Sequence, residues 1–455
     1  MKIHFIAIGG SAMHNLALAL HHKGYEVTGS DDEIFEPSRS RLKAAGLLPE
    51  AWGWFPEKIT PELDAIILGM HARKDNPELL EALRRGIRVY SYPEYLYEQT
   101  RDKKRVVIGG SHGKTTITSM VMHVLHYHNI NFDYMVGALL EGFDTMVRLS
   151  HEAEIAVFEG DEYLSSPIDM RPKFHLYNPH IALLSGVAWD HINVFPTFDE
   201  YVMQFQTFVQ LIEIKGELIY FRGDEILEFI AGKSRSDIRK TPYDTPPYRI
   251  DNEVMILETE SGSVPLNVFG EHNLQNIEGA RKVCNALGVT DEDFFTAIPS
   301  FMGASKRLQK LAENDKLIVY LDFAHSPSKL KATVEAVKLK HPDKTVIACM
   351  ELHTFSSLKK DFLPQYAGSM EKADEAKVYF NPLVVEHKKL APISKQDVAN
   401  GFDGKNVTVY DDSVQLINQL KTRDLNNCVL LLMSSGNFDG VDLATFAKDL
   451  AKKYD

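Results

Sequence analysis

The sequence predicts an α/β protein of three domains, in which parallel sheets are flanked by helices. Three observations indicate this fold class. Apolar stretches of strand length alternate with stretches of helical periodicity along the chain. Two apolar stretches, ending near residues 8 and 108, run directly into glycines that precede a helical pattern. The length of 455 residues is sufficient for three domains at roughly 150 residues each.

The first domain is predicted to span residues 1–100 and to begin with a βαβ unit. An apolar strand is followed by Gly9 and Gly10, then by a helical pattern, then by a strand that ends at Ser30 and Asp31. Further strands continue the alternation, which favours a parallel sheet. The strands predicted here are residues 4–8, the segment ending at 31, 65–68 and 89–92.

The second domain is predicted for residues 101–305 and the third for residues 306–455. In the second domain a strand, a glycine turn and a helix follow one another, and the polar stretch 232–265 is expected to form surface loops and antiparallel strands. The third domain again alternates strands and helices. The predicted strands are 106–108, 155–158, 181–184, 317–321, 346–350, 377–380, 407–410 and 428–433.

The composition excludes several classes of protein. A net charge of -13 argues against a nucleic-acid partner, which requires clustered Lys and Arg. The three cysteines lie far apart and without CxxC spacing, so we expect buried thiols and neither a disulfide framework nor a zinc site. The short apolar run at the N-terminus and the lack of any 18-residue apolar stretch predict a cytoplasmic protein without a membrane partner. The sequence does not predict an oligomeric state.

A glycine turn between a predicted strand and a predicted helix is the strongest functional signal. Its backbone N–H groups and the helix N-terminus would surround phosphate oxygens, and Lys114 would reach the terminal phosphates. Ile108 stands where the usual phosphate loop has its first glycine, so the loop is a shortened relative. The residues predicted to bind phosphates are Gly110, Ser111, His112, Gly113, Lys114, Thr115 and Thr116.

Acidic and histidine side chains follow the next two predicted strands of this domain. Glu159 and Glu162 end one strand, and Asp190 and His191 follow the other. Because parallel strands end at the same edge of a sheet, these groups should lie beside the phosphates, where carboxylates suit magnesium. This pattern predicts a magnesium site at this edge and a catalytic or ligand role for His191.

Several motifs in order resemble the Mur ligase family. They are GSHGKTT at 110–116, FEGDE at 158–162, WDH at 189–191, GEHNLQN at 270–276, Lys306-Arg307 and DFAH at 322–325. The resemblance implies an N-terminal Rossmann-like domain for a UDP-sugar, a central P-loop ATPase-type α/β domain and a C-terminal Rossmann-like domain. It covers essentially the whole chain.

The resemblance also implies substrates and roles for individual residues. The family uses ATP and Mg²⁺ to convert a carboxylate into an acyl phosphate, which an amine then attacks. It implies Thr115, Glu159 and His191 as metal ligands and Lys114, Glu159 and His191 as catalytic residues. For ATP it adds His272, Asn273 and Asn276, the phosphate-contacting Arg307, and Asp322 on the ribose with His325 nearby. For UDP-N-acetylmuramic acid it implies Gly9, Gly10, Ser11, Ala12, Met13, Ser30, Asp31, His71 and Arg73.

The amine partner is the point at which family members compete. MSSGNFDG at 433–440 and the segment 34–38 resemble the recycling ligase that adds L-alanyl-γ-D-glutamyl-meso-diaminopimelate. The alternative is the biosynthetic ligase that adds L-alanine. This alternative stays open because the segment 351–358 matches the amine-side loop of neither enzyme well. Phe205 and Gln206 also occupy the stretch in which several relatives carry a carbamylated lysine.

Three readings from other classes remain as alternatives. A non-catalytic sensor of UDP-sugar and ATP would keep the glycines but could lose Glu159 and His191, which are both present. A small-molecule kinase would leave the third domain unexplained. A nicotinamide dehydrogenase is disfavoured because GxGxxG is absent.

Overall fold

The computed structural model describes residues 1–140, 142–189, 194–251, 254–304, 307–403 and 407–454. The chain divides into two compact units. One comprises residues 1–187, 198–244 and 279–297, and the other comprises residues 188–197, 245–278 and 298–455. The predicted α/β class is confirmed, while the predicted domain limits near residues 100 and 305 stay predictions.

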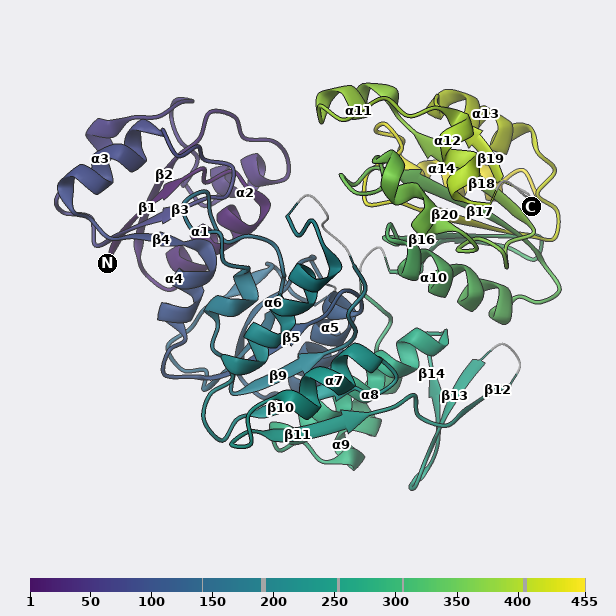
Figure 1. Ribbon diagram of the computed structural model, residues 1–455, viewed down its shortest axis with the longest axis horizontal. Helices are drawn as coiled ribbons and strands as arrows, with labels where there is room; N and C mark the ends of the chain where they lie inside the picture. The colour runs from purple at the N-terminus through teal and green to yellow at the C-terminus, as the bar shows by residue number, and fades with distance from the viewer. Residues whose placement is uncertain (141, 190–193, 252–253, 305–306, 404–406, 455) are drawn as a thin grey trace. The chain divides into compact units, whose positions relative to one another are not determined.

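The N-terminal part of the first unit is a parallel sheet of order β2-β1-β3-β4, flanked by helices (Figure 1). Its core on one face joins Ile6 and Leu68 of the sheet to Leu79 and Ala82 of a helix. The elements are β1 (Lys2–Ile6), α1 (Ser11–His22), β2 (Glu26–Ser30), α2 (Ser38–Ala44), β3 (Ala65–Leu68), α3 (Pro77–Arg85), β4 (Val89–Ser91) and α4 (Tyr92–Gln99).

The central part carries a sheet of order β11-β10-β9-β5-β8-β6-β7, parallel except for its last strand. The strands β9, β5 and β8 are neighbours, so their carboxyl ends meet at one edge. The strands are β5 (Lys104–Gly109), β6 (Phe132–Met135), β7 (Val147–Arg148), β8 (Ile155–Glu159), β9 (Ile181–Leu184), β10 (Glu217–Phe221) and β11 (Arg239–Tyr243). The helices are α5 (Lys114–Tyr127), α6 (Phe198–Gln210), α7 (Glu225–Lys233), α8 (Glu271–Ala286), which continues into the second unit, and α9 (Asp291–Ala297).

The second unit contains an antiparallel sheet, β12-β13-β14, and a mostly parallel sheet of order β15-β16-β20-β17-β18-β19. Helices α10 and α12 pack on one face of the larger sheet, and α13 and α14 pack on the other (Figure 1). The strands are β12 (Tyr248–Asp251), β13 (Val254–Thr259), β14 (Gly262–Leu266), β15 (Gln309–Glu313), β16 (Leu317–Asp322), β17 (Thr345–Leu352), β18 (Glu375–Phe380), β19 (Val407–Tyr410) and β20 (Cys428–Met433). The helices are α10 (Pro327–Lys340), α11 (Pro382–His387), α12 (Lys395–Gly401), α13 (Ser413–Thr422) and α14 (Leu443–Ala451).

Some sequence-based boundaries need correction. The first strand is Lys2–Ile6, because Ala7 turns into the left-handed region at φ +68°. The stretch 232–265 does contain antiparallel strands, but it also contains β11, which pairs in parallel with β10. The cysteines are free and buried, as predicted. Among the described residues, no helix is both long enough and apolar enough to cross a membrane.

Candidate active site

The turn between β5 and α5 is shaped to receive an anion. Gly110 and Gly113 have φ values of +129° and +74°, which residues with a side chain rarely adopt. Gly113 immediately precedes α5, and the first N–H groups of a helix lack intrahelical acceptors and lie at the positive end of the helix dipole. The predicted strand, glycine turn and helix therefore exist in the order that phosphate binding needs.

Lys114 is held by carboxylates that follow β8. Its ammonium lies 2.5 Å from Glu162 and donates to the carbonyl of Gly110 at 2.8 Å. Burial by itself would lower the pKa of Lys114, but Glu162, Asp161 and Glu159 outweigh it, so the pKa is raised above its usual value. The lysine is therefore a fixed cation at the start of α5.

Thr115 and Glu159 form a second pair of contacting side chains at this turn. The Thr115 hydroxyl donates to Glu159 Oε1 at 2.8 Å, and the other carboxylate oxygen accepts from the Gly137 N–H at 2.7 Å. A Cβ at Gly137 would lie 2.9 Å and 3.0 Å from these two carboxylate oxygens, so an alanine there would displace the carboxylate. Glu159 is thus positioned from two sides.

The Thr115 and Glu159 oxygens fit a magnesium ion. Two adjacent ligands of octahedral Mg²⁺, each about 2.05 Å from the metal, are about 2.9 Å apart, close to the 2.8 Å observed. Within the described residues, no group of three or more His, Cys, Asp or Glu side chains could hold a metal ion.

Residues that follow β9 hold the turn through hydrogen bonds. The Ser185 hydroxyl donates to the carbonyl of His112, and the Ser111 N–H donates to the carbonyl of Gly186 at 2.9 Å. The His112 ring lies against Gly186, where a Cβ would collide with it. Asp190 and His191, which the sequence predicted at this edge, lie outside the described residues.

Sequence reasoning missed residues that complete this cluster. The Tyr201 hydroxyl, from α6, bonds Ser111 Oγ at 2.8 Å and Glu162 Oε1 at 3.1 Å, and so joins the turn to the partner of Lys114. Lys173 pairs with Asp161 at 2.8 Å and, against the effect of burial, lowers its pKa. Phe205 is fully buried against Phe174 and Tyr201. No spacing rule points to these residues, because they come from distant elements.

The second unit gathers the residues predicted beside the nucleoside. Asp322 ends β16 and accepts from the Leu308 N–H at 2.7 Å, from the Ala324 N–H at 2.7 Å and from Thr333 at 3.2 Å. The guanidinium of Arg307 lies 4.8 Å from the ring of Phe323. Burial lowers the pKa of His272, although Asp322 opposes the effect. Further contacts involve Asn273 with the Phe269 carbonyl, Asn276 with Asn273, and His325 with the Phe323 carbonyl.

The N-terminal glycine loop is organised by Asp31. One carboxylate oxygen accepts from the Gly9 N–H at 2.7 Å, and the other accepts from the Asp32 N–H at 3.0 Å. Burial raises the pKa of Asp31 to about 6. A Cβ on Gly9 would lie 2.7 Å from Ile34, so the loop needs glycine there. Gly10 adjoins Ser11, Ala12 and Met13 at the start of α1, and Ser30 ends β2.

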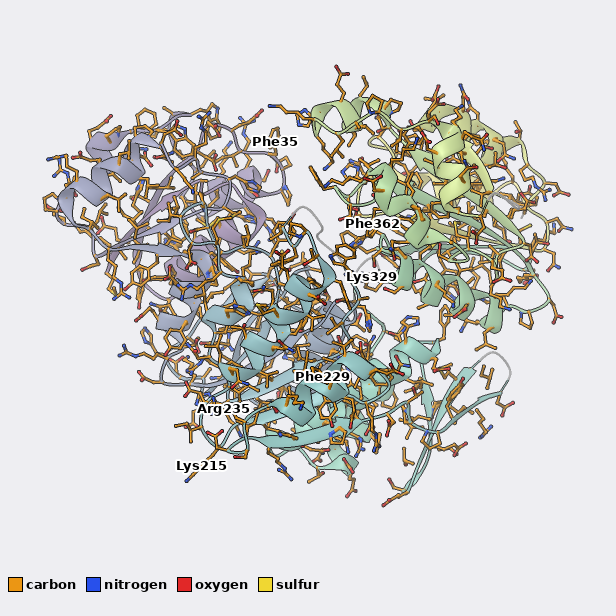
Figure 2. All side chains as sticks on the ribbon, in the orientation of Figure 1. Phe35, Lys215, Phe229, Arg235, Lys329 and Phe362 are labelled. Carbon is orange, nitrogen blue, oxygen red and sulfur yellow. The ribbon has the colours of Figure 1, made fainter. Side chains whose placement is uncertain are left out.

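Other residues predicted for the UDP-sugar are less enclosed. Arg73 is 83% exposed and forms a bidentate pair with Asp75, both distances being 2.9 Å. His71 is exposed as well. Phe35, in the segment 34–38, is 66% exposed at the surface of the N-terminal part (Figure 2).

Family models match the chain in three consecutive ranges. They are described as "Mur ligase family, catalytic domain" over residues 2–104, "Mur ligase middle domain" over 108–284 and "Mur ligase, glutamate ligase domain" over 306–436. The chain belongs to the Mur ligase family. It is therefore an ATP-dependent carboxylate–amine ligase, as the sequence predicted.

Individual Mur ligases resemble the chain along most of its length. The UDP-N-acetylmuramate–L-alanine ligase of Caldicellulosiruptor bescii is 30% identical over 387 residues, 82% of each chain. The UDP-N-acetylmuramate–L-alanyl-gamma-D-glutamyl-meso-2,6-diaminoheptandioate ligase of Escherichia coli K12 is 27% identical over 455 residues, 97% of this chain and 96% of its own. The crystal structure of UDP-N-acetylmuramate-alanine ligase MurC from Thermotoga maritima has a TM-score of 0.72 at 18% identity and covers 100% of this chain and 99% of its own. This last similarity supports the Mur ligase fold.

Proposed function

We propose that this Mur ligase joins the carboxylate of UDP-N-acetylmuramic acid to the amine of L-alanyl-γ-D-glutamyl-meso-diaminopimelate. The carboxylate attacks the γ-phosphorus of ATP, the bond to the β-phosphate oxygen breaks, and ADP leaves. The amine then attacks the acyl phosphate, loses a proton and expels inorganic phosphate. The observation that carries the proposal is the convergence of Lys114, Thr115 and Glu159 at the carboxyl edge of one parallel sheet.

Lys114 acts on the phosphates in this proposal. Its ammonium leaves Glu162 and stabilises the negative charge on the transferring phosphoryl group, while Glu162 stays tethered by Tyr201. Thr115 and Glu159 would hold Mg²⁺, which supplies positive charge to the phosphate oxygens. His191 is proposed as a further metal or phosphate ligand.

The remaining roles rest on the family resemblance. Gly110 to Thr116 bind phosphates, while His272, Asn273, Asn276, Arg307, Asp322 and His325 are proposed for the rest of ATP. The loop Gly9 to Met13, with Ser30, Asp31, His71 and Arg73, is proposed for the UDP-sugar. A cytoplasmic location is part of the proposal, since ATP and a UDP-sugar are its substrates.

The choice of the peptide as the amine rests on sequence resemblance in one segment of the second unit. The segment 433–440, which resembles the recycling ligase, folds back onto Glu351 at the end of β17. Phe438 donates its N–H to Glu351 at 2.9 Å, and Ser434 donates its hydroxyl. A Cβ on Gly436 would lie 2.8 Å from Glu351 and from His353, so the loop closely follows its support.

L-alanine is the second candidate amine. It is favoured by the names of curated relatives such as the Caldicellulosiruptor bescii enzyme, while the Escherichia coli enzyme's name states the tripeptide. The two identities, 30% and 27%, are too similar to separate the candidates.

Phosphate release from ATP, Mg²⁺ and UDP-N-acetylmuramic acid, measured with each amine in turn, tests the proposal. Release with the tripeptide, together with the mass of the condensed product, supports it. Release with L-alanine alone would replace the tripeptide by alanine. Glu159→Gln should abolish turnover. If neither amine stimulates release in the wild type, while UDP-sugar and ATP still bind, the sensor reading replaces the ligase.

A further inference from the structure

The β6–β7 hairpin, residues 132–140 and 142–148, contacts two sites that lie far apart in the sequence. Met146, which precedes β7, meets α1, which follows the N-terminal glycine loop. Gly137, which lies after β6 beside the partner of Met146, meets the carboxylate of Glu159. Both contacts lie within the first compact unit. The proposed function gives each contacted site a different ligand, and no role assigned so far uses the hairpin.

Asn15 makes the contact between α1 and Met146. Its side chain is fully buried, and its carbonyl oxygen accepts from the Met146 N–H at 3.0 Å and from Arg41 at 3.2 Å. Its amide nitrogen donates to the carbonyl of Ser11, the first residue of α1, at 2.8 Å, directly after Gly10 of the glycine loop. Arg41 also donates to the Asp144 carbonyl at 2.8 Å. Because a buried amide is costly to leave unpaired, movement of the loop and movement of Met146 are linked through Asn15.

Gly137 makes the contact between the hairpin and Glu159. Met146 accepts from the Val136 N–H at 3.0 Å, and the next residue, Gly137, donates to Glu159 Oε2 at 2.7 Å. The opposite carboxylate oxygen is the one that accepts from Thr115. Three hydrogen bonds, Asn15 to Met146, Met146 to Val136 and Gly137 to Glu159, therefore connect the two sites.

We propose that the β6–β7 hairpin couples the two substrate sites, so that UDP-N-acetylmuramic acid and Mg²⁺–ATP bind with positive cooperativity, and that Asn15 is a positioning residue for this coupling. The inference rests on the proposed function for the identity of the ligands. Coupling of this kind is reciprocal, so each ligand raises the affinity for the other by the same factor. Typical coupling factors range from about 5-fold to about 150-fold.

Isothermal titration of the full-length protein tests the coupling. The Kd of the β,γ-imido analogue of ATP with Mg²⁺ is measured with and without saturating UDP-N-acetylmuramic acid, and the reverse titration is also made. We expect the wild type to show a coupling factor of about 5 or more in both directions. Asn15→Leu, which keeps the approximate volume but removes the hydrogen bonds, should reduce the factor to below about 2 while each ligand alone binds within about threefold of wild type.

Two further variants separate coupling from folding. Asn285→Leu is the matched control, because Asn285 also donates to a backbone carbonyl, that of Val289 at 3.0 Å, but belongs to α8 and not to α1 or the hairpin. It should keep the wild-type factor. Arg41→Ala removes the hydrogen bonds of Arg41 to Asn15 and Asp144 and should lower the coupling factor partially. It replaces Asn15→Leu in the test if that variant fails to fold.

The outcomes distinguish this inference from the proposed function. If UDP-N-acetylmuramic acid does not bind the wild type, the proposed substrate is wrong, and the coupling fails with it. If both ligands bind but the wild-type factor is 1, or if Asn15→Leu and Arg41→Ala both retain the wild-type factor, the coupling role is refuted and the proposed function stands.

Discussion

Replacing Glu162 by Gln tests the charge balance at Lys114. The ammonium and the carboxylate are 2.5 Å apart, and their side chains are only 13% and 1% exposed. Coulomb's law with an effective dielectric constant of about 20 gives roughly 7 kcal/mol for such a pair, as an upper bound. Removing one partner of a buried pair costs about 3–5 kcal/mol, because the remaining charge stays buried.

Phosphates can replace the lost carboxylate, and this determines the expected result. The nucleotide-free variant should melt at a lower temperature than the wild type. The imido analogue of ATP should bind the variant at least about tenfold more tightly, which corresponds to recovery of about 1.4 kcal/mol of the loss. Thermal melting and calorimetric titration measure the two effects. Asp169→Asn is the control, because its partner Arg171 is 59% exposed and such pairs contribute about 0–1 kcal/mol.

Two results would refute this reasoning about Glu162. One is a variant that melts at the wild-type temperature without nucleotide. The other is a variant whose affinity for the analogue falls, since Glu162 would then contribute to nucleotide binding instead of opposing the release of Lys114. A change of similar size in Asp169→Asn would show that the assay does not distinguish buried from exposed pairs.

Three other substitutions probe the neighbouring groups. Thr115→Val should raise the Mg²⁺ concentration for half-maximal amine-dependent phosphate release by at least about tenfold, because Glu159 loses its hydroxyl partner. Thr115→Ser should restore the wild-type Mg²⁺ dependence. Equal Mg²⁺ dependence in the wild type and both variants would contradict the metal role. Gly137→Ala should lower kcat by at least about tenfold, since its Cβ would meet the Glu159 carboxylate, whereas Gly232→Ala, in open space, should leave kcat unchanged. The pKa of Asp31 is raised from 3.8 to about 6, so its ionisation disfavours the folded state, and the stability of the wild type should fall as pH rises from about 4 through 6. The melting temperature of Asp31→Asn relative to wild type should therefore increase over that range. A difference in melting temperature that is independent of pH would contradict the assignment.

Apolar patterning located several of the buried strands but not all of them. Strands at 65–68, 181–184, 407–410 and 428–433 were predicted with the boundaries that the structure has, whereas the buried strands β6 (FDYM) and β10 (ELIYF) were not predicted. The strand β11 was missed because its sequence, RKTPY, is polar, contains a proline and lies at the edge of the sheet, where one side has no strand partner. The edge strand β19, VTVY, is half-buried and keeps an apolar signal that the polar edge strand β11 lacks.

The sequence predicted parts of the candidate site, but not the groups that position them. Lys114 and Glu159 follow strands and glycines in a recognisable order, whereas Tyr201 reaches the site from a helix that begins at Phe198. Its contact with Ser111 depends on how α6 packs, and packing between distant segments has no local sequence pattern. The same holds for Asn15, whose partner Met146 lies 131 residues away.

The segment 433–440 shows most clearly why family resemblance does not determine specificity. In MSSGNFDG, Phe438 and Asp439 have φ values of +49° and +59°, a region that favours glycine and costs other residues of order 1 kcal/mol. Asp439 is held in this conformation by Asn381 at 2.8 Å and by the Tyr379 hydroxyl. Tyr379 and Asn381 belong to β18 and the residue after it, outside the segment 433–440. The motif alone therefore determines neither the shape of this loop nor the carboxylate that the loop carries, and a resemblance in the motif does not select one amine.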